Sequence, residues 1–149
     1  MKIKDLLGQV NHIDHSVPQT WTVAAAIEQL QTSQTRVLIA TAGETPVGVF
    51  GEREVLHCLL AHRGRPLSDI LVQEVMTRQP VVADAEAELA GVVDAVLQAD
   101  ATHMAVMDAG RLAGVLPLAA LVRHQIDSLT AQLHYLQDYI SDLHEADQD

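Results

Sequence analysis

The chain contains an internal repeat, which limits its fold to an arrangement of two similar halves. The segment VGVFGEREVLHCLL (47–60) resembles AGVLPLAALVRHQI (113–126) at a spacing of 66 positions. Upstream, TRVLIATAG (35–43) resembles THMAVMDAG (102–110) at a spacing of 67 positions. We therefore expect one extra residue in the hairpin turn of the first copy, because AGETPVG is one residue longer than AGRLAG.

Each copy is predicted to run strand, helix, strand, turn, strand and helix. Its short apolar runs are bounded by Gly, Pro and Asp, which is typical of buried strands. A unit of about 60 residues buries only a modest core, so the two copies are expected to pack against each other. The predicted elements cover 12–17, 22–31, 37–41, 47–50 and 52–61 in the first copy, and 81–83, 86–98, 104–107, 112–116 and a helix from Pro117 in the second.

The composition indicates a folded domain without a general affinity for nucleic acids. Apolar residues make up 48% of the chain and charged residues 19%, which favours a globular fold over disorder. The net charge of −11 argues against binding to DNA, RNA or an anionic membrane through a general basic surface. No apolar run approaches the ~20 residues that span a bilayer, and MKIKDLLGQV (1–10) lacks the apolar core of a signal peptide. We therefore expect a cytoplasmic protein.

Neither the cysteine nor the histidines indicate a metal site or a catalytic centre. The single cysteine, Cys58, excludes an internal disulfide and a multi-cysteine zinc site. His12 and His15 lie three positions apart on a predicted strand, where they point to opposite faces, and the other histidines are scattered. No pairing of a nucleophile with a base and no Gly-rich phosphate loop stands out. We predict that the chain is not an enzyme and holds no metal.

Two segments carry a resemblance to a known family. VQEVMTRQPVV (72–82) and THMAVMDAGRLAGVL (102–116) resemble the corresponding parts of a pair of CBS domains, also called a Bateman module. The tail RHQIDSLTAQLHYLQDYI (123–140) is similar to the C-terminal helix of small stand-alone bacterial CBS-domain proteins. The resemblance covers the chain from about residue 10 to residue 124.

The resemblance implies an α/β (α+β) fold with tandem CBS repeats. Each repeat is expected to form a small three-stranded sheet with two helices, and the repeats to be related by a pseudo-twofold axis. We expect repeat 1, with the N-terminal segment, in residues 1–66 and repeat 2 in residues 67–124. Residues 125–149 are expected to form a long C-terminal helix.

The resemblance also implies a ligand class, because CBS pairs commonly bind adenosyl nucleotides between their repeats. Their last strand–helix turn reads Gly, two apolar residues, Ser or Thr, two variable residues and Asp. The hydroxyl and the first helical N–H groups meet phosphate, and the Asp accepts hydrogen bonds from ribose hydroxyls. In GVFGERE (48–54), Gly51 replaces the hydroxyl residue and Glu54 replaces the Asp, while Arg53 stands where many relatives have Arg. Arg36 precedes a strand that would line the same cleft.

Two interpretations of this first site stay open. Gly51 lets a phosphate approach closely, and Glu54 keeps a carboxylate on a longer arm. Alternatively, Glu52 and Glu54 are favourable charges at a helix N-terminus, with no ligand bound. The second copy, GVLPLAA (114–120), has lost the hydroxyl and the carboxylate to Pro117 and Ala120. Proline is favourable at the first helical position, so the second turn is predicted to hold no nucleotide.

Three further residues are candidates for the border of the cleft. Thr77 and Arg78 lie in the linker, and Thr20 precedes the first helix. Their alternative roles are structural, since Thr77 would cap a turn, Arg78 would be solvated and Thr20 would cap the helix. The predicted ligand-binding residues are therefore Gly51, Arg53, Glu54, Arg36, Thr20, Thr77 and Arg78.

The C-terminal segment shows a heptad pattern. Its apolar residues recur at alternating intervals of three and four, which is typical of a helix that pairs with another helix. A helix from Pro117 to Leu143 would be about 40 Å long, which exceeds what one small module needs. We expect it to contact a partner subunit; the alternative is that it packs back onto its own domain. The predicted dimer residues are Ile126, Leu129, Leu133, Leu136, Ile140 and Leu143.

Together these observations predict a cytoplasmic, non-catalytic regulatory module for signal transduction that forms a homodimer and acts on an unidentified protein target. It would sense AMP, ADP, ATP or a related adenosyl ligand in one degenerate site and require no cofactor. The alternative is a ligand-free homodimeric interaction scaffold in which both nucleotide sites are lost.

Overall fold

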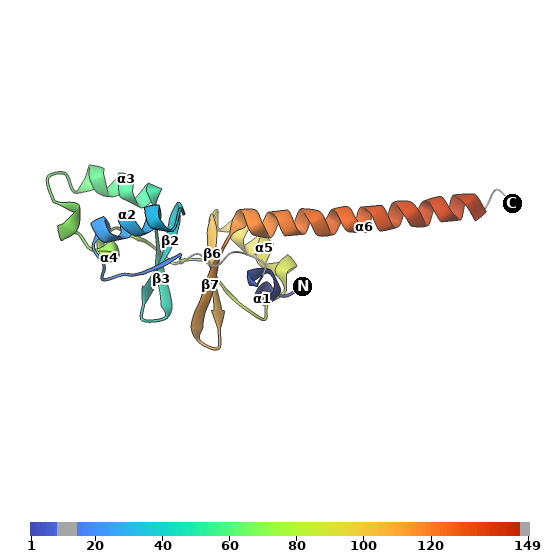
Figure 1. Ribbon diagram of the computed structural model, residues 1–149, viewed down its shortest axis with the longest axis horizontal. Helices are drawn as coiled ribbons and strands as arrows, with labels where there is room; N and C mark the ends of the chain where they lie inside the picture. The colour runs from blue at the N-terminus through green and yellow to red at the C-terminus, as the bar shows by residue number, and fades with distance from the viewer. Residues whose placement is uncertain (9–14, 147–149) are drawn as a thin grey trace.

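The computed structural model describes residues 1–8 and 15–146, and it confirms the predicted fold class (Figure 1). Two halves with the same element order each combine a small sheet with helices. The first half contains β1 (Ser16–Pro18), α2 (Val23–Thr32), β2 (Val37–Ala42), β3 (Thr45–Gly51) and α3 (Glu52–Ala61). The second contains β5 (Val82–Asp84), α5 (Leu89–Gln98), β6 (His103–Asp108), β7 (Arg111–Pro117) and α6 (Leu118–Ala146).

Four further elements lie outside this repeated pattern. The short helix α1 (Ile3–Leu7) precedes the first half. The linker between the halves forms the 3-10 turn η1 (Leu67–Asp69), the helix α4 (Val72–Val75) and the strand β4 (Thr77–Arg78). The predicted strand at 12–17 begins at Ser16, and its positions 12–14 lie outside the described residues.

The two sheets have the same topology except for one strand. In each, the first strand is parallel to the second and the second is antiparallel to the third, in the orders β1-β2-β3 and β5-β6-β7. The first sheet gains β4, which pairs antiparallel with β3 through Gly48–Arg78 and Val49–Thr77. The first sheet therefore has four strands instead of the predicted three, because the linker extends it.

The expected extra residue in the first hairpin turn is wrong. Ala42 pairs with Thr45 and Asp108 pairs with Arg111, so both turns contain two residues and the spacing of 66 holds throughout. Aligning the two Ala-Gly pairs of the sequence misaligns the turns, because the glycine is the first of the two turn residues in the first hairpin and the second in the other. In the first turn, Gly43 has a positive φ of 63°. In the second turn, both Ala109 and Gly110 have positive φ, with values of 52° and 80°.

The sequence predicts Pro117 as the first helical residue, but this position is wrong. Pro117 is the last residue of β7, and α6 begins at Leu118. The strand continues to this point because Pro117 pairs with His103. The Leu118 N–H then donates to the Thr102 carbonyl at 2.8 Å, which holds the start of the helix beside β6.

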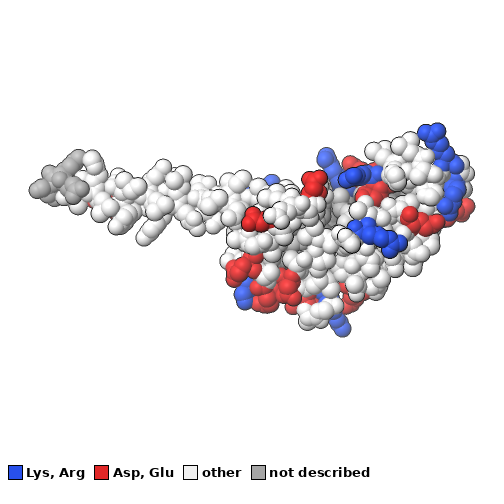
Figure 2. All heavy atoms as spheres, turned by 180° about the vertical axis from the view of Figure 1, so that it is seen from behind, with Lys and Arg blue, Asp and Glu red and all other residues white. Residues whose placement is uncertain are grey.

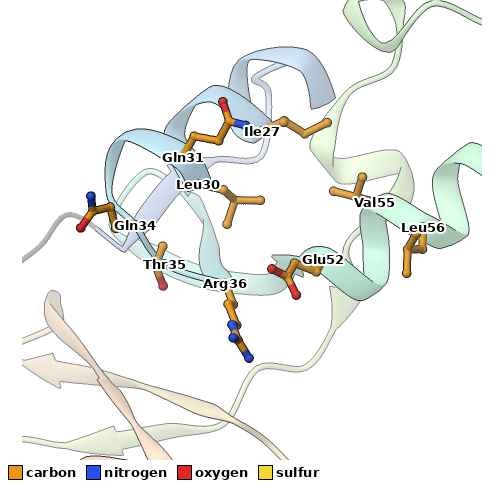
Figure 3. Close-up of a pocket in the computed structure, with 9 residues that line it drawn as sticks. All are labelled: Ile27, Leu30, Gln31, Gln34, Thr35, Arg36, Glu52, Val55 and Leu56. Atoms are coloured by element: carbon orange, nitrogen blue, oxygen red, sulfur yellow. The ribbon is translucent and has the colours of Figure 1, made fainter.

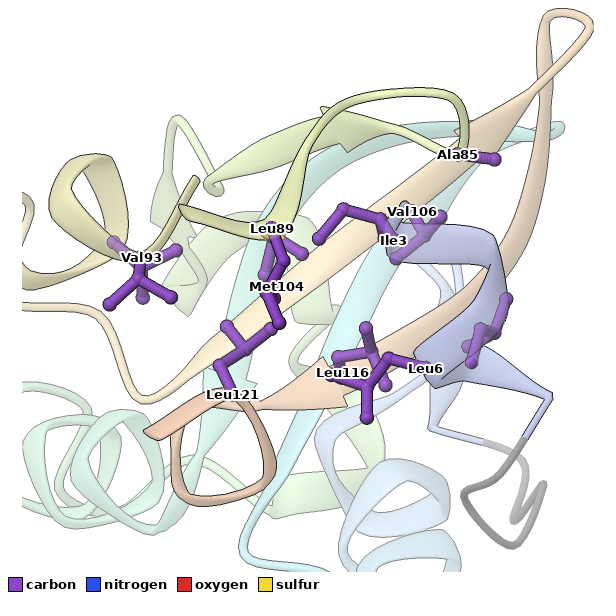
Figure 4. Packing of buried hydrophobic residues seen from close by; sticks show 11 residues of the cluster. Ile3, Leu6, Ala85, Leu89, Val93, Met104, Val106, Leu116 and Leu121 are labelled. Atoms are coloured by element: carbon purple, nitrogen blue, oxygen red, sulfur yellow. The ribbon is translucent and has the colours of Figure 1, made fainter. Parts of the chain in front are cut away.

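Each half has its own hydrophobic core, and each core receives a segment from elsewhere in the chain. The first core contains Ile70, Val72 and Met76 of the linker. The second contains Ile3 and Leu6 of α1, packed among side chains of α5, β6, β7 and α6 (Figure 4). The helix α1, expected with repeat 1, thus completes the second half, and the linker, expected with repeat 2, completes the first. The division of the repeats between residues 66 and 67 stays a prediction.

Two equivalent glycines let these segments approach the sheets. A Cβ atom on Gly48 would lie 2.5 Å from the Met76 Sδ atom, and one on Gly114 would lie 2.7 Å from the Leu7 Cδ1 atom. Both contacts are shorter than packed atoms tolerate. Met76 and Leu7 therefore play the same part in the two halves, although the first follows α4 and the second ends α1.

The two sheets meet through a small apolar cluster. Ile39 of β2 is buried with Ala105 and Val115 of β6 and β7, and Val49 and Leu112 pack against them. Beside this cluster, the rings of His15 and His103, from different halves, lie 6.3 Å apart between centroids. Burial lowers the pKa of His103 to about 4, and the neighbouring charge of His15 adds to this shift.

We expect the protein to lose stability as the pH falls from about 6.5 towards 4. In this window unfolded His103 binds a proton while folded His103 does not, so protons favour the unfolded chain. Urea denaturation at pH 7 and pH 5 measures the difference, and His103→Gln should reduce it. His134→Gln, on the exposed part of α6, is the control and should not. An equal pH dependence in all three proteins would contradict the prediction.

The helix α6 projects far beyond the second half (Figure 1). Its 29 residues make it about 43 Å long, and Leu121 is its one buried residue. The alternative that the helix packs back onto its own domain is therefore wrong for this conformation. No helix among the described residues is long and apolar enough to cross a membrane.

Candidate functional site

The carboxylate of Glu54 lies at the N-terminus of α3, where both of its oxygens accept hydrogen bonds from the chain itself. The Gly51 N–H donates to Oε2 at 2.9 Å, and the Thr77 hydroxyl donates to Oε1 at 2.7 Å. The Glu54 residue is only 8% exposed. This geometry matches the interpretation of Glu54 as a charge that stabilises the helix N-terminus.

The bond between Thr77 and Glu54 also joins the linker to the first half. Thr77 faces α3 because β4 pairs with β3, with Thr77 opposite Val49. In place of a turn cap, the alternative role given to Thr77, its hydroxyl donates to a helix carboxylate. Sequence reasoning placed Thr77 near the cleft but did not predict this bond, because nothing local to the linker indicates it.

Gly51 is required by a close approach of the chain to itself. A Cβ atom at this position would lie 2.6 Å from the Arg36 carbonyl oxygen and 3.0 Å from the Val37 Cγ2 atom. The Arg36 carbonyl accepts the Glu52 N–H at 3.2 Å, which holds the two segments together. Gly51 is buried, so the space left by its missing side chain is filled by Arg36 and Val37.

A cavity of about 610 Å³ opens between α2 and α3 of the first half (Figure 3). One wall is apolar, formed by side chains of both helices. The rest of its lining is polar and includes Glu52, at the first turn of α3, and Arg36, whose side chain points away from the apolar wall (Figure 3). The lining residues are Ile27, Leu30, Gln31, Gln34, Thr35, Arg36, Glu52, Val55 and Leu56.

The predicted ligand-binding residues are only partly brought together. Gly51, Glu54 and Thr77 form one hydrogen-bonded cluster, while Arg36 lines the cavity. The remaining three residues are exposed and do not line the cavity: Arg53, Arg78 and Thr20.

The predicted alternative role of Thr20 as a helix cap is wrong. Thr22 caps α2, and its hydroxyl oxygen accepts the Ala25 N–H at 3.2 Å. Sequence reasoning missed Gln31, Gln34 and Thr35 as cavity residues. Thr35 could have been predicted as a cavity residue, because it lies beside Arg36 just before the buried strand β2. No pattern in the sequence marks Gln31 or Gln34 as cavity residues.

The equivalent turn of the second half offers different chemistry. Pro117 stands where the first half has Gly51, and Ala120 stands where it has Glu54. The hydrogen bond from the Leu118 N–H to the Thr102 carbonyl is equivalent to that from the Glu52 N–H to the Arg36 carbonyl. The backbone geometry of the turn is thus kept, while the carboxylate is absent.

The metal-ligating residues form no metal site in the part of the chain that the structure describes. Within residues 1–8 and 15–146, no group of three or more His, Cys, Asp or Glu side chains is placed to hold a metal ion. His12 lies outside this part. Cys58 is buried in the first core, and this burial raises the pKa of its thiol.

Comparisons with known proteins identify the fold. The CBS domain family model matches residues 72–127. A CBS-domain-containing protein from Agrobacterium tumefaciens is 21% identical, with a TM-score of 0.70 over 84% of this chain and 99% of its own. A CBS-pair protein from Arabidopsis thaliana is also 21% identical, with a TM-score of 0.67 over 87% of this chain and 96% of its own.

A CBS domain protein from Pyrobaculum aerophilum, solved in complex with AMP, is 19% identical. Its TM-score is 0.67 over 80% of this chain and 89% of its own. No curated protein matches the chain. The solved structures therefore establish the likeness of fold.

Proposed function

The chain contains a CBS domain in residues 72–127 and has the fold of a CBS pair, and from this premise we propose that it is a non-catalytic regulatory module that senses an adenosyl nucleotide. We further propose that it works in the cytoplasm as a homodimer and passes the signal to a protein target. The proposal assigns one nucleotide to each chain, bound in the first half.

The cavity beside Arg36 has the size and lining that a nucleotide needs. Small-molecule sites commonly measure about 300–1,000 Å³ and combine apolar walls with a few polar groups, and this one measures about 610 Å³. Leu30 and Val55 offer apolar contacts for an adenine ring. The Arg36 guanidinium offers charge-assisted hydrogen bonds to phosphate. The Glu52 carboxylate is an acceptor for ribose hydroxyls.

Two comparisons support this assignment. The structural neighbour from Pyrobaculum aerophilum was solved with AMP, so a CBS protein of this fold accommodates an adenosine nucleotide. Within the chain, the charged residues of the cavity occur in one half, because Thr102 and Leu118 stand where the first half has Arg36 and Glu52. The observation that carries the proposal is the exposed Arg36 side chain on the apolar cavity next to the N-terminus of α3.

We expect Arg36→Ala to weaken nucleotide binding roughly tenfold or more, because a hydrogen bond to a charged group contributes about 1.5–3 kcal/mol. Isothermal titration calorimetry with AMP, ADP, ATP, NAD and S-adenosylmethionine measures this effect. Arg63→Ala removes an exposed arginine outside the cavity and should leave the affinity unchanged. Equal affinities for both variants would move the site away from Arg36.

A ligand-free homodimeric scaffold is the second candidate function. It is favoured by the Glu54 carboxylate, whose two oxygens are already occupied by Gly51 and Thr77. If none of the five ligands produces heat or raises the melting temperature at millimolar concentration, the scaffold replaces the sensor. A nucleotide that copurifies with the protein and is identified by mass spectrometry would exclude it.

A further inference from the structure

The exposed seam of α6 carries an inference about how two copies of this chain associate. The seam consists of six residues, each between 50% and 63% exposed: Ile126, Leu129, Leu133, Leu136, Ile140 and Leu143. We propose that the seams of two copies pair as a parallel, in-register, two-stranded coiled coil. This inference rests on the homodimer in the proposed function and is independent of nucleotide binding.

The projecting part of α6 needs a partner for physical reasons. Beyond the second half, the helix makes no contact that buries its apolar side chains. A helix without tertiary contacts gains little stability in water, because most helical stability in proteins comes from the packing of an apolar face. Burial of the seam against a second helix supplies the missing stabilisation.

The residue types along the seam favour two parallel strands. Ile126, Leu133 and Ile140 occupy the a positions of the heptads, and the d positions are all leucine. Among parallel coiled coils, isoleucine at a with leucine at d, found here at two of the three a positions, favours two strands, whereas isoleucine at both positions favours three or four. No polar residue interrupts the six positions from Ile126 to Leu143.

The charges on α6 favour a second copy of the same chain as the occupant. The chain carries a net charge of −11, so two copies repel each other unless the carboxylates stay away from the contact. The four carboxylates of the described helix are at outer positions of the heptad: Asp127, Asp138, Asp142 and Glu145. The flanking e and g positions hold Arg123, Gln125, Thr130, Gln132, Gln137, Tyr139, His144 and Ala146.

The positions beside the seam thus hold no acidic residue, and one face of the projecting helix is almost free of charged side chains (Figure 2). A basic partner would gain from carboxylates at these positions, since flanking charges set the choice of partner. Their absence instead keeps like charges from facing each other beside the seam when two identical acidic chains pair.

The coiled coil would be joined rigidly to the second half. Leu121, in the first turn of α6, is fully buried in the second core, and no glycine or proline interrupts the helix between Leu118 and Ala146. A parallel pair therefore places the two second halves side by side at one end of the coil, with the C-terminal ends of both helices at the other.

Cysteine cross-linking tests the direction of the pairing. In the parallel arrangement, Leu143→Cys brings two thiols together, and mild copper-catalysed oxidation by oxygen removes two electrons and two protons to form a disulfide. Non-reducing electrophoresis should then show a covalent dimer. The unchanged protein is the control, because its one thiol, Cys58, is buried and should not cross-link.

The antiparallel arrangement predicts the opposite pattern. It would bring residue 126 of one helix beside residue 143 of the other, so a mixture of Ile126→Cys and Leu143→Cys would form a mixed dimer while neither variant alone would. That result would overturn the proposal. It would also be overturned if light scattering showed a dimer of Leu143→Cys that the oxidant did not cross-link.

A second pair of variants tests whether the seam holds the dimer at all. Leu133→Asp should convert the dimer to a monomer in light scattering, whereas Ser128→Asp, outside the seam, should not. Circular dichroism checks that both variants keep a folded module. A dimer that survives Leu133→Asp would overturn the proposal, but nucleotide titration of the same variant would still test the sensor separately.

Discussion

Replacing Phe50 by alanine should lower the free energy of unfolding by about 3–5 kcal/mol. Phe50 is fully buried in β3, where it packs in the first core with Leu38 and Cys58. Removing its ring forfeits the burial of a large apolar side chain and leaves a cavity that the surrounding aliphatic residues fill only partly. The melting temperature should fall by roughly 6–20 °C, at about 2–4 °C per kcal/mol for a chain of this size.

The internal repeat provides a matched comparison for this variant. Leu116 occupies the equivalent position of β7 and is also fully buried, so Leu116→Ala should lower the free energy of unfolding by about 2–5 kcal/mol. Leu97→Ala removes a side chain that is 53% exposed and should change it by less than about 0.5 kcal/mol. Urea denaturation at one fixed protein concentration measures all three. If Phe50→Ala behaved like Leu97→Ala, the assignment of the first core would be wrong.

Gly51→Ser should lower the free energy of unfolding by about 1–3 kcal/mol, although it restores the hydroxyl of the family pattern. The backbone at Gly51 is extended, with φ of −152°, so any residue can adopt it. The obstacle is space, because the new Cβ would lie 2.6 Å from the Arg36 carbonyl oxygen. One of the two backbone segments must shift to accommodate it.

Gly91→Ser is the control for this effect. A Cβ atom at Gly91, which lies in α5, would meet no atom within 4 Å. Serine has a higher helix propensity than glycine, so the variant should be neutral or slightly stabilising. Thermal denaturation of both variants measures the contrast. A Gly51→Ser protein as stable as the unchanged protein would show that the close approach to Arg36 is not rigid.

Several features of the fold follow from short-range patterns in the sequence. The helix predicted at 52–61 coincides with α3, because a glycine precedes two first-turn carboxylates and an apolar periodicity. The heptads in residues 126–143 predict a continuous helix, and α6 contains all of them. These signals depend on residues only a few positions apart, which is why they can be recognised without a structure.

Prediction from the sequence alone was less successful where similar residues lie in different structural environments. The spacing of 67 came from aligning two Ala-Gly pairs, whereas the strand pairing keeps the spacing at 66. Gly51 offers room for a phosphate in one of the two interpretations of the sequence, and the structure shows that the Arg36 backbone lies where its side chain would be. In both cases the deciding contact joins residues that are not neighbours in the sequence.

By itself, the sequence determined the two similar halves, the order of their elements, the aliphatic cores and the apolar seam of the last helix. Only the tertiary structure decided that α1 completes the second half and the linker the first, that Thr77 binds Glu54 and that Arg36 lines a cavity. The reason is physical. Periodicity and capping report interactions within one element, whereas the exchange of segments and the hydrogen bonding of a buried carboxylate depend on which distant surfaces pack together.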